Sequence, residues 1–153
     1  MRIEEVVVKT QEEEGVVLKY IRMTKDFEEI RDYCTHKGET ITGYTHEREA
    51  VCVRLEDILY FEAVGELVFA YLEKDVYEVR SRLYQLEERL GQKNLRRASK
   101  SVLLNVERIV SVRPALNGRL LAKMENGEEV MISRNYAKEI ARYIMEEDED
   151  ERV

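Results

Sequence analysis

From residue 50 to residue 132 the chain is a succession of short runs rich in Val, Ile, Leu, Tyr and Phe, separated by turn-like segments. Such runs predict β-strands. Asn126-Gly127 is the strongest turn signal, because both residues tolerate the positive φ angles of a type I′ hairpin. Asn117-Gly118 marks a second turn. We expect strands at Ala50–Leu55, Ile58–Glu62, Leu67–Leu72, Val76–Arg80, Ser101–Leu104, Ile109–Arg113, Arg119–Glu125 and Glu129–Ile132.

Two helices accompany these strands. Leu83, Leu86 and Leu90 share one face of a short helix, which Ser81 could cap and Gly91 could end. A last helix is expected from about Arg134 to Met145. Its inward residues are Ala137, Ile140, Ala141 and Ile144.

The N-terminal region is harder to interpret. A first strand is expected at Ile3–Val8. Residues 16–23 are ambiguous: apolar residues continue from Val16 to Cys34 in steps of four and three, as in a helix, yet the side chains at 16–21 favour a strand. Thr24 resembles an N-cap followed by an acidic first turn. We favour a strand at 16–22 and a helix at 25–36 that Gly38 closes.

The composition suits one soluble domain. The chain has 153 residues, of which 44% are hydrophobic and 37% are charged, and one proline, which excludes collagen-like, proline-rich and disordered chains. No apolar stretch approaches the roughly 20 residues needed to cross a bilayer. The acidic N-terminus lacks a signal-peptide core, and two cysteines are too few for a disulfide scaffold. We therefore expect a cytoplasmic protein.

Neither metal nor catalytic chemistry has a clear signature. Cys34, His36, His46 and Cys52 form C-x-H-x9-H-x5-C, which is not a zinc-finger spacing. Both cysteines are more simply small core residues, Cys52 at an inward strand position. The chain has no G-x-S-x-G elbow, P-loop or G-x-G-x-x-G motif, and no cysteine–histidine pair placed for nucleophilic catalysis. We predict no metal, cofactor, small-molecule substrate or enzymatic activity.

Charge is segregated along the chain. Residues 1–90 carry a net charge of −8, residues 91–145 a net +6 with eleven basic side chains, and residues 146–153 a net −5. This segregation suggests one face that meets an anion, although a solvated surface of mixed charge is the alternative. The acidic end is typical of a disordered tail.

Two basic residues in the +6 segment lie at junctions between elements. Lys100, next to Ser99, leads into an apolar strand, and Arg134 lies where a strand ends and the last helix begins. A guanidinium can bond a guanine edge bidentately, and a lysine can reach guanine or phosphate. Lys100 alone could be an ordinary surface lysine. Together the two positions favour nucleic-acid binding.

Five segments in order resemble the LytTR DNA-binding domain of bacterial transcription regulators. They are Asp57–Ala63, Leu83–Leu90, Arg97–Asn105, Asn126–Glu128 and Ser133–Lys138. The N-terminal stretch with Thr42-Gly43-Tyr44 is similar to stand-alone members without a receiver domain. The resemblance implies a mostly β (α+β) fold of stacked antiparallel sheets with short helices, plus a small N-terminal α/β extension. It also implies loops that enter successive major grooves of bent DNA.

The resemblance further implies base-reading positions. Those of the family correspond here to Lys100, Arg134 and the loop Gly65-Glu66. Two departures stand out: Ser99-Lys100 replaces the frequent His-Arg or His-Asn, and Glu66 can accept from cytosine N4 but repels phosphate. Ser101 and Asn105 match the family and are interpreted as structural. The expected DNA-binding residues are Gly65, Glu66, Arg97, Ser99, Lys100, Arg134, Asn135 and Lys138.

We therefore predict a bacterial, response-regulator-like protein that binds double-stranded DNA sequence-specifically as a homodimer. Residues 1–46 would form an extension for dimerisation or partner binding, residues 47–145 the LytTR-like domain, and residues 146–153 the tail. The resemblance also implies a membrane protein as an inhibitory partner. The alternative is a protein-interaction module of the same fold with little DNA affinity, since the net charge of −7 and Glu66 oppose binding.

Overall fold

The structure, a computed structural model, describes residues 2–10, 15–36, 39–90 and 94–151, without the side chains of 32–36 and 146–151. The chain forms two compact units, residues 1–37 and residues 38–153, which we describe separately. Within the described residues, no helix is both long enough and apolar enough to cross a membrane.

The first unit contains helix α1 (Lys25–His36) at the predicted position. The Thr24 carbonyl accepts a hydrogen bond from the Glu28 amide at 3.0 Å. Asp26 and Glu28 place negative charge in the first turn, where the helix dipole favours it. The rings of Tyr20 and Phe27 pack with their centroids 5.8 Å apart. The predicted end at Gly38 lies outside the described residues.

The two strands expected before α1 are wrong. Residues 2–10 and 15–24 contain no strand, so residues 16–23 form neither the strand nor the helix that the sequence offered. Most of their apolar side chains are exposed, those of Val7 and Ile21 almost completely. β-branched residues favour a strand through packing on a sheet, and here the described part of the unit supplies no strand to pair with.

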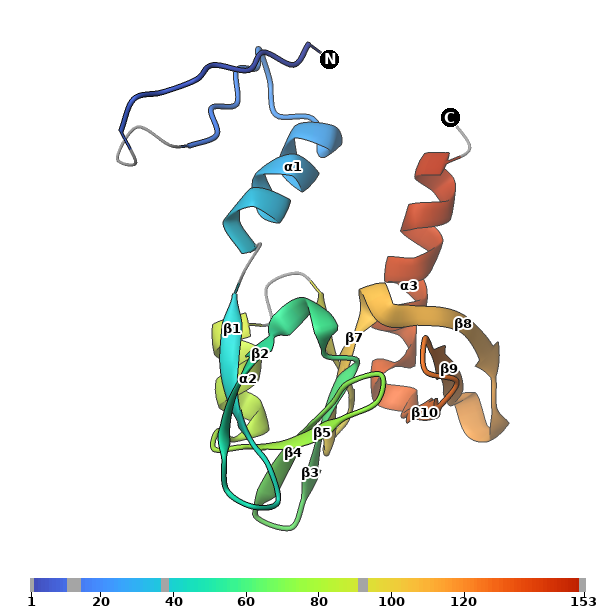
Figure 1. The fold of residues 1–153 in the computed structure, drawn as a ribbon. Coiled ribbons are helices and arrows are strands. Elements are labelled where there is room, and N and C mark those ends of the chain that lie inside the picture. Colours follow the sequence, from blue (N-terminus) through green and yellow to red (C-terminus); the bar gives the residue numbers. More distant parts are fainter. Residues whose placement is uncertain (1, 11–14, 37–38, 91–93, 152–153) are drawn as a thin grey trace. The chain divides into compact units, whose positions relative to one another are not determined.

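The second unit is built on two antiparallel sheets (Figure 1). The larger has the strand order β2-β1-β5-β4-β3-β7-β6 and the smaller β10-β9-β8. The strands are β1 (Thr40–Tyr44), β2 (Ala50–Arg54), β3 (Tyr60–Val64), β4 (Leu67–Tyr71), β5 (Val76–Val79), β6 (Leu95–Ser99), β7 (Val102–Asn105), β8 (Ile109–Pro114), β9 (Leu120–Met124) and β10 (Glu129–Ile132). The remaining elements are helices α2 (Leu83–Leu90) and α3 (Arg134–Glu151) and the 3-10 turns η2 (Leu55–Asp57), η3 (Val106–Arg108) and η4 (Leu116–Gly118). The predicted mostly β fold with short helices is confirmed.

The larger sheet is buried on both faces at its centre. Phe61 and Leu103 contribute to one core, which α2 completes with Leu83 and Leu86. Their chain neighbours Tyr60 and Leu104 point to the opposite face and enter a second core. That second core also contains residues of the smaller sheet and of α3, namely Ala122, Met124, Val130, Ile132, Ala137 and Ile140. The two sheets are therefore stacked through shared side-chain packing.

Two strands were not expected from the sequence. β1 contains Gly43, where an added Cβ would come within 2.7 Å of the Tyr77 Cβ, so glycine permits the close approach of β1 to β5. β6 has the sequence Leu-Arg-Arg-Ala-Ser, whose two arginines hide the strand pattern. Because β1 pairs with β2 and β5, residues 40–44 belong to the second unit, whereas the extension was expected to reach residue 46.

Three further details correct the expectations. In the hairpin between β9 and β10, Gly127 has a positive φ of 86°, but Asn126 does not, so the turn is not type I′. Instead, Asn126 Oδ1 accepts from the Glu128 amide at 3.0 Å. Cys52 is exposed, because Val51 and Val53 take the inward positions of β2. Helix α3 continues to Glu151, so the predicted disordered tail is helical through that residue.

Candidate nucleic-acid interface

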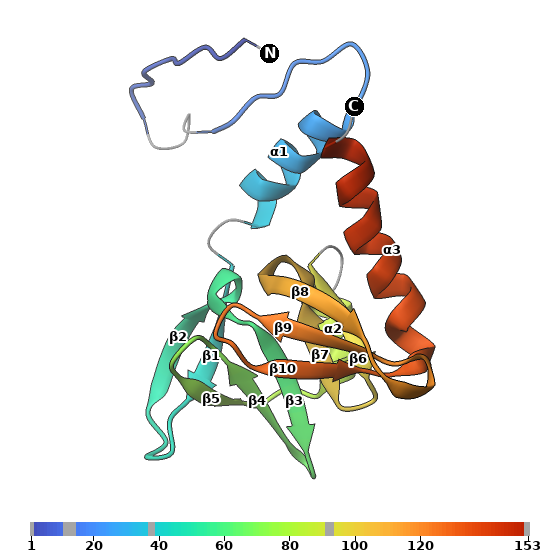
Figure 2. The same ribbon diagram turned by 90° about the vertical axis from the view of Figure 1, so that its right-hand side faces the viewer.

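Three chain segments meet at one end of the larger sheet. The Ala63 amide donates to the Ser101 carbonyl at 2.8 Å, which joins β3 to the β6–β7 turn. The Ser133 amide donates to the Ala98 carbonyl at 2.7 Å, which joins the start of α3 to β6. Figure 2 shows the β3–β4 turn, the β6–β7 turn and the start of α3 along the lower part of the unit. We call these three segments the loop end.

Lys100 lies in the β6–β7 turn, and its side chain is exposed. Hydrogen bonds fix the turn beneath it: Ser99 Oγ accepts from the Ser101 amide at 3.2 Å and lies 3.3 Å from Ser101 Oγ. Arg97 Nη1 donates to the Lys100 carbonyl at 2.9 Å. The backbone is therefore held while the ammonium group projects from it.

Arg97 and Ser99 thus have partners within the turn itself. Besides its bond to Lys100, Arg97 donates from Nε to Glu87 Oε2 at 2.7 Å, and its side chain is only 17% exposed. This ion pair joins β6 to α2. Arg97 is therefore placed to position the turn, whereas Lys100 is placed to reach outward.

Arg134 begins α3 and is exposed, as are Asn135 and Lys138 in the following turn. The Ser133 carbonyl starts the helix by accepting from the amides of residues 136 and 137, both at 3.0 Å. The N-terminal end of a helix carries a partial positive charge that attracts anions. No acidic residue occupies the first turn of α3. The electrostatics of this junction therefore favour a phosphate or the acceptor edge of a base.

The β3–β4 turn consists of Gly65, with a positive φ of 62°, and Glu66. Both residues are exposed, between the half-exposed side chains of Val64 and Leu67. Glu66 is thus the acidic side chain that the β3–β4 turn presents at the loop end.

The ten described basic residues of the +6 segment divide into two groups. Arg96, Arg97, Arg108 and Arg113 form ion pairs with Glu139, Glu87, Glu125 and Glu129. Six others are exposed and form no ion pair within the part of the chain that is described: Lys100, Arg119, Lys123, Arg134, Lys138 and Arg142. The second group is the one available to an anionic polymer.

The sequence interpretation did not assign a role to the β8–β9 turn. Leu116 is 84% exposed there, and Arg119 follows Gly118, which lies against the Arg134 side chain. The signal was present in Asn117-Gly118, a turn within the basic segment, but its proximity to Arg134 depends on the fold. Asn117 has the positive φ of 62° expected of such a turn.

A phenol–carboxylate bond joins the two sheets at the start of β3, the end of that strand away from the β3–β4 turn. Tyr60 Oη donates to Glu128 Oε2 at 2.6 Å, and the Tyr60 ring stacks on Tyr71 with centroids 4.5 Å apart. Burial, aided by Glu128, raises the pKa of Tyr60 well above its usual value. Burial and the nearby Glu62 raise the pKa of Tyr71 as well. Both phenols therefore stay protonated and serve packing. Asn105 is also structural, as expected: its Nδ2 donates to the Ile58 carbonyl at 2.9 Å.

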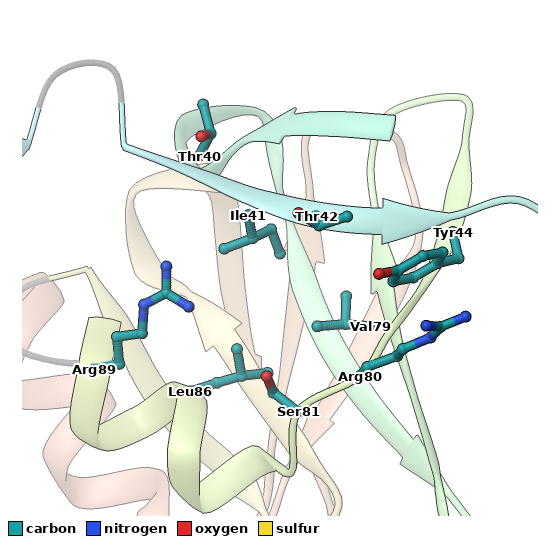
Figure 3. A pocket seen from close by; sticks show the side chains of 9 residues that line it. All are labelled: Thr40, Ile41, Thr42, Tyr44, Val79, Arg80, Ser81, Leu86 and Arg89. Atoms are coloured by element: carbon teal, nitrogen blue, oxygen red, sulfur yellow. The ribbon is translucent and has the colours of Figure 1, made fainter. Parts of the chain in front are cut away.

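A hollow of about 200 Å³ lies between β1 and α2 (Figure 3). It is lined by Thr40, Ile41, Thr42, Tyr44, Val79, Arg80, Ser81, Leu86 and Arg89. The Arg80 guanidinium lies over the Tyr44 ring, 3.8 Å from its centroid. Among these described residues there is no histidine, cysteine or carboxylate to act as a base or nucleophile. The hollow therefore offers no catalytic pair.

Turns and a helix start that present unpaired cations on a rigid β scaffold define a nucleic-acid-binding domain. The family model of the LytTr DNA-binding domain matches residues 48–145, and the chain belongs to this family. The solved structure of a LytTr DNA-binding domain from Bacillus cereus has the same fold, with a TM-score of 0.64 and 24% identity over 69% of this chain and 95% of that one.

Curated relatives are regulators. The sensory transduction protein LytT of Bacillus anthracis is 30% identical over 114 residues, 71% of this chain and 46% of the relative. The chain thus spans about half the length of this relative. An uncharacterized HTH-type transcriptional regulator of Staphylococcus aureus is 28% identical over 104 residues, 68% of this chain and 69% of that one. These relationships support a DNA-binding transcriptional regulator.

Proposed function

We propose that this protein regulates transcription by reading the major grooves of double-stranded DNA with the loop end, and that it has no enzymatic activity. Lys100 and Arg134 read bases, while Asn135 and Lys138 contact phosphates near the start of α3. The observation that carries this assignment is the bond between Ala98 and Ser133, which joins β6, whose turn bears Lys100, to the start of α3, which bears Arg134. A guanidinium and an ammonium at rigid junctions suit base-edge readout.

The loop end and the adjacent β8–β9 turn can present several cations to one face of a duplex. The β6–β7 turn contributes Lys100, the β8–β9 turn Arg119, and the start of α3 Arg134 and Lys138. Phosphate contacts would set the register of the domain on DNA, and base contacts would set the sequence preference. Glu66 adds an acceptor for cytosine N4 at the β3–β4 turn.

The deciding experiment is selection of binding sites from a random duplex library with the pure protein, followed by selection with Arg134→Ala. A recovered consensus that loses one position in the variant supports base readout by Arg134. Failure of the wild-type protein to enrich any sequence, together with no retention on random duplex at low salt, contradicts the proposal.

A second candidate function is a protein-interaction module of the same fold with little DNA affinity. Glu66 at the loop end and the net charge of −7 favour it. Retention on heparin or on random duplex at low salt separates the two functions, because both are polyanions.

Regulation would involve the rest of the chain. We propose that the protein is a cytoplasmic, response-regulator-like homodimer, and that a membrane protein restrains it through the N-terminal unit. That unit is a suitable partner surface, because many of its apolar side chains are exposed. Binding of such a partner would be tested by co-purification with and without residues 1–37.

A further inference from the structure

β2 is an edge strand that lacks the usual protection against pairing. Within the described residues it has a strand partner, β1, on one side only. Its five residues pair with β1 without a register shift, and it contains neither proline nor glycine. Natural edge strands usually carry bulges, prolines or charges that prevent a further strand from adding. β2 presents a regular edge with a single charge, on Arg54.

Of the other three edge strands, β6 and β8 differ in this respect, whereas β10 pairs with β9 without a register shift. β6 has a register shift between Arg97 and Ser99, and its outer side is bonded by the Ser133 amide. β8 has a register shift between Ile109 and Ser111 and ends at Pro114. β2 is therefore the regular edge of the larger sheet, whereas the opposite edge of that sheet, β6, is irregular.

The hydrogen bonds at the ends of the β1–β2 ladder show which backbone groups face the open edge. The Leu55 amide donates to Glu39 at 2.9 Å, and the Thr45 amide donates to Glu49 at 3.0 Å. Odd-numbered residues of β2 therefore bond to β1, and alternation in an antiparallel ladder directs the N–H and C=O groups of Ala50, Cys52 and Arg54 outward. These are three donors and three acceptors on a five-residue strand.

We propose that β2 pairs antiparallel with β2 of a second copy about a two-fold axis at Cys52, the middle residue of the strand. This pairing rests on the homodimer of the proposed function and names the surface through which its two copies associate. Each outward N–H and C=O then finds a partner, which gives six backbone hydrogen bonds by symmetry. In this register Cys52 faces its own counterpart, and Val51 faces Val53.

The charges of the β2 residues are also compatible with this antiparallel register. Arg54 of each copy faces the small, neutral Ala50 of the other, so the five strand positions bring no like charges opposite each other. β2 lies at the opposite end of the strand order from β6, so the pairing leaves the β6–β7 turn uncovered.

A five-residue strand pair alone buries less than a stable interface needs. The dimer is therefore weak in solution and is strengthened when two DNA half-sites hold both copies together.

Cys52 gives a direct test. The chain has two cysteines, so Cys34→Ala leaves Cys52 as its single thiol. Opposed residues of a bonded pair have Cα atoms about 5.5 Å apart, within the range that a disulfide spans. Mild oxidation of full-length Cys34→Ala protein, bound to DNA with two half-sites, should give a covalent dimer. Cys52→Ser protein treated in the same way should not.

A matched pair of variants tests the register without altering a cysteine. Ala50→Glu places a carboxylate opposite Arg54 of the second copy, and Ala50→Lys places a cation there; each change occurs twice in the dimer. We expect the dimer dissociation constants of the two variants, measured by sedimentation, to differ by about tenfold, with Ala50→Glu the tighter. Equal melting temperatures would show that both variants fold alike.

Three results would overturn the inference: a monomer at high concentration and on paired half-sites, equal dimerisation of the two Ala50 variants, or a dimer that Cys52 does not cross-link. The affinity for a single half-site, measured in parallel, tests the proposed function independently of the dimer. A protein that binds a single half-site but forms no dimer on paired half-sites contradicts the β2 dimer alone. A β2 dimer without DNA affinity contradicts the proposed function alone.

Discussion

The side chain of Arg134 lies against the backbone of Gly118: a Cβ added to Gly118 would approach Cγ and Cδ of Arg134 to 3.1 Å. Gly118 also has a positive φ of 73°. The β8–β9 turn therefore determines where the guanidinium of Arg134 can lie, although it is separated from Arg134 by two strands.

Gly118→Ala should weaken specific DNA binding through Arg134. The methyl group displaces the arginine stem, and the left-handed backbone costs roughly 1–2 kcal/mol of folding free energy. Gly127→Ala is the matched control, because Gly127 has a positive φ of 86° and no atom within 4 Å of the added Cβ. Equal DNA affinities for the two variants, measured by fluorescence anisotropy, would show that the contact does not matter for binding.

Arg134→Ala should reduce affinity for the selected site by about 1–3 kcal/mol and relax preference at one base position. Lys138→Ala, four residues further along α3, should weaken all duplexes alike. Titration of both variants against the selected site and a scrambled site distinguishes these roles. If Arg134→Ala lowers both affinities equally, Arg134 contacts only the backbone.

DNA affinity should fall steeply with salt. Each phosphate neutralised contributes about −0.9 to the slope of log K against log salt. Phosphate contacts by Arg119 and Lys138 alone therefore give a slope of roughly −2. Lys138→Ala should lower its magnitude by about one, whereas Arg113→Ala, which removes a cation paired with Glu129, should leave it unchanged. A slope near zero in the wild-type protein would contradict the electrostatic footprint.

Stability should decrease at alkaline pH because of Tyr60. Its pKa is raised in the folded state, so the folded protein holds the proton more tightly than the unfolded chain does. This contribution is complete below the unfolded pKa of about 10 and is lost as the pH rises above it. Tyr60→Phe should make the loss of melting temperature above pH 10 shallower, while Tyr71 retains part of it. An unchanged alkaline slope in Tyr60→Phe would exclude this origin.

The strands that the sequence predicted correctly are those whose side chains alternate or cluster as a buried strand requires. β10 matches its predicted bounds, and β3 begins two residues later than expected. β1 and β6 were missed for physical reasons: Gly43 serves close packing on Tyr77, and Arg96 and Arg97 are half-buried because they pair with Glu139 and Glu87. Local composition does not reveal such long-range partners.

The same limit applies to the loop end. The junction positions of Lys100 and Arg134 were visible in the sequence, because each adjoins an apolar strand. Their proximity was not, since it depends on the bond from Ser133 to Ala98 across 35 positions of chain. For the same reason the β8–β9 turn, with Arg119 and Leu116, was left without a role.

Removal of residues 146–153 should tighten non-specific DNA binding and change the melting temperature little. The segment carries a net −5, which opposes approach to a polyanion. Its sequence is acidic apart from Arg152 and Val153, and negative charge at a helix C-terminus is unfavourable to the helix dipole. The buried residues of α3, Ala137 and Ile140, precede it and keep their packing. As a control for chain length, the six acidic residues of 146–151 would be replaced by glutamine. This replacement should reproduce the gain in affinity for random duplex at low salt. A melting temperature that falls by several degrees on truncation but not on replacement would instead assign this end of α3 a packing role.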